Sequence, residues 1–278
     1  MEILLRNCNI QDTICDYEGN MDLLIQDKKI IRIAKNIEEQ PDRIIDIKGL
    51  TVIPGLIDLH CHLREPGFEY KETIKSGTEA AAKGGYTVIC CMPNTNPVID
   101  NTQVLLKLKD IIERDSLIRV IPIGAVTLGQ KGEETVDFQD LVNHGVNLFS
   151  DDGYPIWNNF IMLKSLEASK DKNFLIIDHC EDLGLVDGGV INQGEVSKQL
   201  GLKGISGLSE ELLVLRDVVL AEEVDAKVHI AHISTAKSLE IIKRAKSKGI
   251  AVSCEVTPHH ISLSDEDIIN DDTNYKVN

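Results

Sequence analysis

Two histidines one residue apart stand where an apolar segment ends. His60 and His62 close the mostly apolar residues 52–59. Successive side chains of a strand point to opposite faces, so these two imidazoles project from the same side. Two imidazoles on one face, at the carboxyl end of a strand, can bind one divalent metal ion. Arg64 takes the next position on that side, and its planar guanidinium suits a substrate carboxylate.

Further apolar segments also end in residues that bind metals. The residues at these segment ends are His179 after residues 174–178, His232 after residues 228–231, and Asp151 and Asp152 after residues 146–150. If these strands lie side by side, four histidines and at least one carboxylate converge. That is more than one tetrahedral zinc ion can use, so the sequence predicts two metals about 3.5–4 Å apart that share a carboxylate and a hydroxide.

Strand and helix patterns alternate from Thr51 onward and must position these side chains. Apolar segments predict strands at residues 52–60, 87–92, 118–124, 146–149, 174–179, 227–232 and 250–256. Helical patterns occupy residues 72–83, 103–114, 160–168, 210–222 and 237–248. Such alternation predicts a parallel sheet covered by helices. Histidines at the strand ends suit an active site on the carboxyl face of a (β/α)8-type barrel.

The first fifty residues follow a different pattern of short strands and turns. Strands are predicted at residues 3–5, 22–26, 30–33 and 44–46, with a polar turn at residues 16–20. We therefore predict an α/β protein with two domains, a small β-sandwich portion at residues 1–50 and a barrel at residues 51–278. The barrel is expected to be incomplete, because seven strand units are found before the chain ends and a closed barrel needs eight.

Composition excludes several functional classes. The net charge of −16 argues against nucleic-acid binding, which needs clustered Lys and Arg. The N-terminus has no signal-peptide pattern and the apolar segments are too short to cross a membrane, so we expect a cytoplasmic protein. The seven cysteines are an odd number and several lie in apolar segments, which predicts free thiols in a reducing compartment.

Other polar residues lie near the predicted strand ends. The asparagines of residues 92–97 can bind an amide or a carboxylate, or can form an Asn-Pro turn. Asp58 is expected to support a ligand histidine from one layer deeper. His229 is expected to point to the opposite face of its strand. His259 and His260 are loop residues or hydrogen-bond partners of the ligands.

Several of these motifs together resemble the dihydroorotases of the amidohydrolase superfamily, in the bacterial single-function form. The resemblance runs from about Gly49 to the last residue and rests on the segments DLHCHLREPG, KETIKSGTEAAAKGGYT, CMPNTNP, FSDDG, HCED, AHIS, EVTPHH and DTNYKVN. The strings REPG, MPNT and DTNYK-x-N are much more discriminating than His-x-His, which every cyclic amidohydrolase shares.

The resemblance implies a dinuclear zinc site and a substrate site. One zinc ion is bound by His60 and His62 and the other by His179 and His232. Many relatives bridge the metals with a carboxylated lysine, but no lysine stands near this strand end, so Asp152 is the predicted bridge and Asp151 the second choice. The residues implied in substrate binding are His62, Arg64, Asn94 and Asn278.

The implied reaction is the reversible cyclisation of N-carbamoyl-L-aspartate to dihydroorotate in pyrimidine biosynthesis, by a homodimer. The family's acid/base aspartate stands at the end of the eighth strand, beyond residue 278, so the 278-residue chain alone is expected to bind zinc poorly, with fewer than the two ions of the complete family, and to be inactive. Two alternatives stay open. The chain is another cyclic amidohydrolase (dihydropyrimidinase, hydantoinase or allantoinase), or it is a non-catalytic amidohydrolase-like scaffold.

Overall fold

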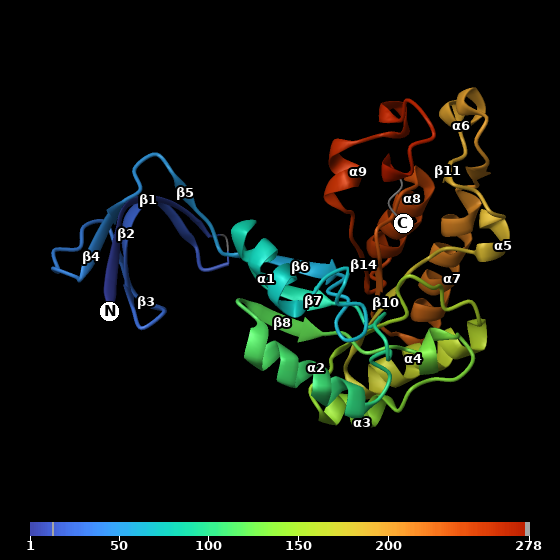
Figure 1. Cartoon of the computed structure of the whole chain (residues 1–278), viewed down its shortest axis with the longest axis horizontal. Helices are drawn as coiled ribbons and strands as arrows, with labels where there is room; N and C mark the ends of the chain where they lie inside the picture. Colours follow the sequence, from blue (N-terminus) through green and yellow to red (C-terminus); the bar gives the residue numbers. More distant parts are fainter. Residues whose placement is uncertain (13, 276–278) are drawn as a thin grey trace. The chain divides into compact units, whose positions relative to one another are not determined.

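The computed structural model describes residues 1–12 and 14–275 and divides the chain into two compact units, Met1–Leu56 and Ile57–Asn278 (Figure 1). The sequence pattern places this boundary after residue 50. The difference arises because Thr51 and Val52 pair with the first strand of the N-terminal unit. None of the helices among the described residues has the length and apolar character needed to cross a bilayer.

The N-terminal unit is a five-stranded sheet. Its strands are β1 (Glu2–Asp12), β2 (Tyr17–Gln26), β3 (Lys29–Ala34), β4 (Arg43–Asp46) and β5 (Thr51–Val52). The order is β3-β2-β1-β4, with β5 also paired to β1, and β1, β2 and β3 are antiparallel neighbours. The turn predicted at residues 16–20 is wrong for most of its length, because Tyr17–Asn20 pair with Asn9–Asp12 of the long β1.

The second unit contains a wall of seven strands that follow one another in space as in the sequence. They are β6 (Leu56–Cys61), β7 (Tyr86–Cys91), β8 (Arg119–Pro122), β9 (Leu148–Ser150), β10 (Leu175–Asp178), β13 (Val228–Ile230) and β14 (Val252–Cys254). The wall consists of the sheets β6-β7-β8 and β9-β10-β13-β14, which a parallel bridge between Gly124 and Phe149 connects. Strand order that equals chain order is typical of the (β/α)8 architecture.

The first predicted strand proves to be two strands. Residues 52–60 do not form one continuous element, because β5 ends at Val52 and β6 begins at Leu56. Pro54 and Gly55 lie between them, and proline cannot donate a hydrogen bond to a strand ladder. Consequently Val52 belongs to the N-terminal sheet, and only the later part of the segment positions His60.

Helices cover the outside of the wall (Figure 1). The main ones are α1 (Ile74–Lys83), α2 (Thr102–Asp115), α4 (Asn159–Lys172), α7 (Leu208–Val224) and α8 (Ala236–Ser247). They pack on β7, β8, β10, β13 and β14 respectively. Four of them begin with a side chain that accepts a hydrogen bond from the first turn, at Thr73, Asn101, Asn158 and Thr235. These helices match the five predicted ones.

Six shorter elements escape the sequence pattern because each is too short to show a hydrophobic period. They are α3 (Phe138–Asn143), α5 (Leu183–Val186), β11 (Ile191–Asn192), α6 (Glu195–Leu200), β12 (Gly204–Ile205) and α9 (Pro258–Ser262).

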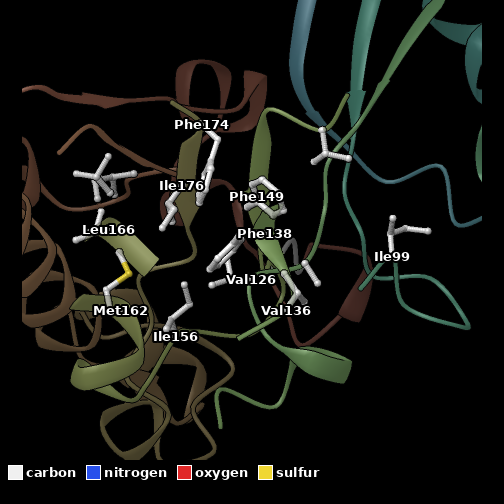
Figure 2. Close-up of a cluster of buried hydrophobic side chains, with 14 of the residues drawn as sticks. Ile99, Val126, Val136, Phe138, Phe149, Ile156, Met162, Leu166, Phe174 and Ile176 are labelled. Atoms are coloured by element: carbon white, nitrogen blue, oxygen red, sulfur yellow. The ribbon is translucent and has the colours of Figure 1, made fainter. Parts of the chain in front are cut away.

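Buried side chains fill both faces of the wall. Between wall and helices, the rings of Phe138, Phe149 and Phe174 lie 4.5–5.1 Å apart (Figure 2). Such tilted and edge-to-face contacts stabilise aromatic clusters beyond the area they bury. A second, smaller cluster consists of Cys90, Met92, Ile123, Ile177 and Ala231. Its members belong to β7, β8, β10 and β13 or to the residues that follow these strands, close to the strand ends that carry the candidate site.

Candidate metal centre

Asp152 lies two residues beyond β9, only 3% exposed, and four histidines surround its carboxylate. Its Oδ2 atom lies 3.3 Å from the Nε2 atoms of both His60 and His62. Its Oδ1 atom lies 3.4 Å from Nδ1 of His179 and 3.2 Å from Nε2 of His232. The two oxygens of one carboxylate therefore face two separate pairs of imidazoles.

The members of each histidine pair come close to each other as well as to Asp152. The Nε2 atoms of His60 and His62 are 3.3 Å apart, and Nδ1 of His179 is 3.0 Å from Nε2 of His232. His60 belongs to β6 and His62 follows it, whereas the other two follow β10 and β13. The structure thus brings together all five residues that the sequence singles out as metal ligands.

Burial and close pairing shift the pKa values in this cluster. Burial disfavours the charge of His60, but the bonds to Asp152 and Glu255 outweigh it and raise the pKa of His60 to about 9. Burial also disfavours the charge of His179, but the bonds to Asp152 and Glu181 outweigh it and raise the pKa of His179 to about 10. Burial by itself raises the pKa of Asp152, but the hydrogen bonds to the surrounding histidines outweigh it and hold this pKa well below the ordinary value. The site therefore favours an ionised carboxylate and positive charge beside it.

Three of the histidines have their second ring nitrogen near an oxygen. Nδ1 of His60 lies 2.6 Å from Oε1 of Glu255, and Nδ1 of His62 lies 3.0 Å from Oδ1 of Asn94. Nε2 of His179 lies 3.4 Å from Oε2 of Glu181. Such partners fix the tautomer and the orientation of metal-binding imidazoles.

The sequence patterns did not indicate a role for Glu255 or Glu181. Each had a usable signal, because Glu255 directly follows β14 and Glu181 stands two residues after His179. Both are acidic residues at the same strand ends as the candidate ligands.

Three secondary expectations need correction. Asp58 accepts a bond from the backbone N–H of His60 at 3.0 Å, so it contacts the main chain and not the imidazole. The carboxylate of Asp151 accepts bonds from Val126 and Thr127, which excludes it as a bridge. The expectation for His229 is wrong, because its Nε2 atom lies 3.3 Å from Glu255 on the side of the site.

The predicted substrate-binding residues lie beside the histidines. Arg64 is half-buried, and no carboxylate of the described residues lies within ion-pair distance of its guanidinium. Asn94 uses Oδ1 for His62 and keeps its amide N–H group, which lies close to Gly153. Asn278 lies outside the described residues. Arg64 also adopts a left-handed backbone conformation with φ 62°, which is uncommon for residues other than glycine.

The donor set fits a pair of divalent metal ions. His60, Asp152 and His232 place potential ligand atoms within 4.8 Å of one another, and His62 and His179 contact the same carboxylate. Imidazole nitrogens and a carboxylate are the ligands that zinc accepts, and manganese and cobalt accept them too. Each oxygen of Asp152 and the two imidazoles beside it would give one ion three ligands, a donor set of the kind found in catalytic zinc sites.

Comparison with known proteins identifies the family of this chain. Residues 49–238 match the dihydro-orotase-like family. The chain is 45% identical over 279 residues to a protein named dihydroorotase from Syntrophus aciditrophicus, and 46% identical over 277 residues to one from Thermoanaerobacter sp. strain X514. The whole chain is matched in both cases, against 66% and 64% of those proteins. The chain thus spans about two thirds of the length of these curated relatives.

Solved structures support the fold. The L-hydantoinase (dihydropyrimidinase) of Arthrobacter aurescens superposes with a TM-score of 0.81 at 20% identity, over 95% of this chain and 60% of that one. The dihydropyrimidinase of Brevibacillus agri NCHU1002 gives a TM-score of 0.80 at 20% identity, over 98% of this chain and 61% of that one. The predicted α/β architecture with part of an amidohydrolase-type barrel is confirmed. With residues 49–238 matched and 45% identity along its whole length, the chain belongs to the dihydroorotase-like family of cyclic amidohydrolases.

Proposed function

We propose that this chain carries the metal-binding and substrate-binding part of a dihydroorotase, which interconverts N-carbamoyl-L-aspartate and dihydroorotate. The observation that carries the proposal is the Asp152 carboxylate, whose two oxygens each face one histidine pair at 3.2–3.4 Å. The names of relatives at 45–46% identity agree with it. Because the chain spans about two thirds of their length, the activity is proposed for the whole enzyme.

The metal ligands in this proposal are His60 and His62 for one zinc ion and His179 and His232 for the other. Asp152 spans both. Zinc, when bound, supplies Lewis acidity and makes water acidic enough to ionise near neutral pH. Asn94 holds the imidazole of His62 in the orientation that ligation needs.

Two residues of the chain bind and orient the substrate. The guanidinium of Arg64, which has no carboxylate partner among the described residues, binds the substrate carboxylate through two parallel hydrogen bonds. The amide N–H of Asn94, for which the described residues offer no acceptor, donates a second, neutral contact to the substrate. Fixing the ring at two points holds its amide bond in register with the metal ligands, which lowers the entropic part of the barrier. The resemblance assigns protonation of the ring nitrogen to an aspartate beyond residue 278.

The hydantoinase and dihydropyrimidinase alternative has less support. Those solved structures are 20% identical to the chain and show the fold alone. Their substrates lack the carboxylate for which Arg64 is suited. The scaffold alternative does not explain why five potential ligands keep close pairing around one buried carboxylate.

The test is an activity and binding assay with three substrates. The chain, extended by the C-terminal third of the Syntrophus aciditrophicus relative, should hydrolyse dihydroorotate, followed by ultraviolet absorbance, and leave dihydrouracil and allantoin nearly untouched. Arg64→Lys keeps the charge but loses the second hydrogen bond, so KM for dihydroorotate should rise about 10- to 100-fold, as expected for ~1.5–3 kcal/mol from a bond to a charged group. Lys237→Arg on the surface of α8 serves as the control. Faster turnover of dihydrouracil than of dihydroorotate would contradict the proposal.

The wider setting is also part of this proposal. We propose that the enzyme acts in pyrimidine biosynthesis in the cytoplasm, and that it is a homodimer as the superfamily resemblance implies. Sedimentation of the extended chain checks the oligomeric state, and a mass corresponding to the monomer would contradict the dimer.

A further inference from the structure

We propose that Glu255 and His229 form a positioning pair that holds His60 in the tautomer and orientation needed for metal binding. This inference rests on the proposed function, because it gives His60 the role of a ligand. Neither residue belongs to the ligand set that the sequence or the resemblance indicates.

The geometry links three strands through one carboxylate. Oε1 of Glu255 lies 2.6 Å from Nδ1 of His60, and Oε2 lies 3.3 Å from Nε2 of His229. His229 is held in turn by Ser253, whose hydroxyl oxygen lies 2.8 Å from Nδ1 of the imidazole. His60 belongs to β6, His229 to β13 and Ser253 to β14, and Glu255 follows β14 directly.

The contact to Glu255 decides which nitrogen of His60 is free. A carboxylate only accepts hydrogen bonds, so Nδ1 of His60 must carry the proton that lies between the two atoms. The lone pair of the neutral imidazole is then on Nε2, which is the atom that faces Asp152 and His62. Without an acceptor at this place, the ring is free to rotate or to change tautomer. Partners of this kind typically raise metal affinity 10- to 100-fold.

The burial of the pair argues for a role beyond packing. The side chains of His229 and Glu255 are 8% and 17% exposed. Burying polar groups costs free energy unless they are well paired. The Nε2 atom of His229 has no hydrogen bond of good geometry among the described residues, and the Glu255 carboxylate at 3.3 Å is the acceptor that faces it. In this proposal the attraction between the two groups restricts the second oxygen of Glu255 and so keeps the first one on His60.

The experiment titrates Co²⁺ into the metal-free chain, extended at its C-terminus as in the activity assay above, and follows the d–d absorption bands. The unaltered chain should bind two equivalents. Glu255→Ala removes the acceptor and should weaken one of the two sites about 100-fold, whereas Glu255→Gln keeps an amide oxygen and should weaken the same site about 10-fold. His229→Asn should give a smaller loss. The double variant Glu255→Ala, His229→Asn should bind no worse than Glu255→Ala, because both changes act through one contact.

A second readout reports the tautomer directly. In the zinc-loaded chain, the ¹⁵N shifts of the His60 imidazole should show a protonated Nδ1, and Glu255→Ala should shift or broaden that resonance. A merely structural role of Glu255 would leave it unchanged. Glu240→Gln, an exposed residue of α8, is the matched control and should bind Co²⁺ as the unaltered chain does.

The possible results distinguish a failure of the positioning role from a failure of the proposed function on which it rests. No Co²⁺ binding by the unaltered chain would overturn the proposed metal site and the positioning role together. Two sites in the unaltered chain, with unchanged affinities in Glu255→Ala and Glu255→Gln, would overturn the positioning role alone. Equal weakening of both sites would also overturn it, because that result indicates general loosening of the fold. Should Glu255→Ala fail to fold, the nearly isosteric Glu255→Gln decides.

Discussion

At the scale of single residues, two neighbouring aspartates have opposite surroundings. Asp152 faces four imidazoles, and they hold its pKa well below the ordinary value although burial opposes this. Asp151 is buried against Val126 and Thr127, and burial raises its pKa to about 6 although hydrogen bonds oppose the shift. The chemical difference between the two positions therefore comes from what each side chain contacts.

Asp152→Asn is expected to abolish the binding of both metals. An amide has one oxygen, so its NH₂ group must face one histidine pair and cannot ligate a cation there. We expect a zinc content below about a tenth of that of the unaltered chain, consistent with the loss of a shared ligand. Elemental analysis of dialysed protein measures this.

Asp171→Asn, at an exposed position of α4, is the control for Asp152→Asn and should retain its metal. Full zinc occupancy in Asp152→Asn would show that the carboxylate is not the bridge.

At the scale of elements, one arginine ties α7 to the wall. The side chain of Arg216 is 10% exposed and contacts two fully buried carboxylates, Asp178 at 2.8 Å and Asp217 at 2.7 Å. It also donates to the carbonyl of Ile156, in the loop after β9. Asp178 ends β10 directly before His179. Arg216 therefore connects helix, strand and loop behind the candidate metal centre.

Arg216→Met should destabilise the fold by about 3–5 kcal/mol, because it leaves buried carboxylates without their cation. Urea unfolding followed by circular dichroism measures the change. Arg114→Met is the matched control, since that arginine pairs with Asp115 on the surface, where ion pairs contribute little. Equal midpoints for the two variants would show that the buried cluster does not stabilise α7 against the wall.

At the scale of the whole molecule, the seven cysteines are free thiols, as the composition predicts, and four of them are buried. Burial raises the pKa of Cys90 to about 11 and that of Cys91 to about 12, from an ordinary value of 9.0. In the unfolded chain these thiols ionise first. Their contribution to stability is therefore complete below pH 9.0 and is lost as the pH rises through the folded values.

The free energy of unfolding should accordingly fall as the pH rises from about 9 to about 12. Urea unfolding at successive pH values measures the slope. The decisive comparison is Cys91→Ala, which removes one of the buried thiols and should show a shallower decline. Cys15→Ala removes an exposed thiol and should leave the slope unchanged. Parallel slopes for the two variants would contradict the prediction.

The sequence by itself determined the alternation of seven strands with helices and the placement of His60, His179 and His232 at strand ends. These features are local, because apolar periodicity and segment length act over a few residues. Parallel strands carry their carboxyl ends to one edge, so convergence of the ligands also followed from the pattern. The interruption at Pro54 was local too, but its effect depended on β5 pairing with a distant strand.

Only the tertiary structure decided which residues contact one another at that edge. The choice between Asp151 and Asp152 depended on side-chain direction just beyond a three-residue strand, where periodicity no longer holds. The contact of Glu255 with His60 joins residues 195 positions apart, and no local pattern reports such a distance. Contacts between strand ends depend on how the strands are ordered in space. Many different local sequence patterns are compatible with that order, so the patterns alone do not identify the contacts. The sequence therefore supplied the ligand types, and packing determined the partners that orient them.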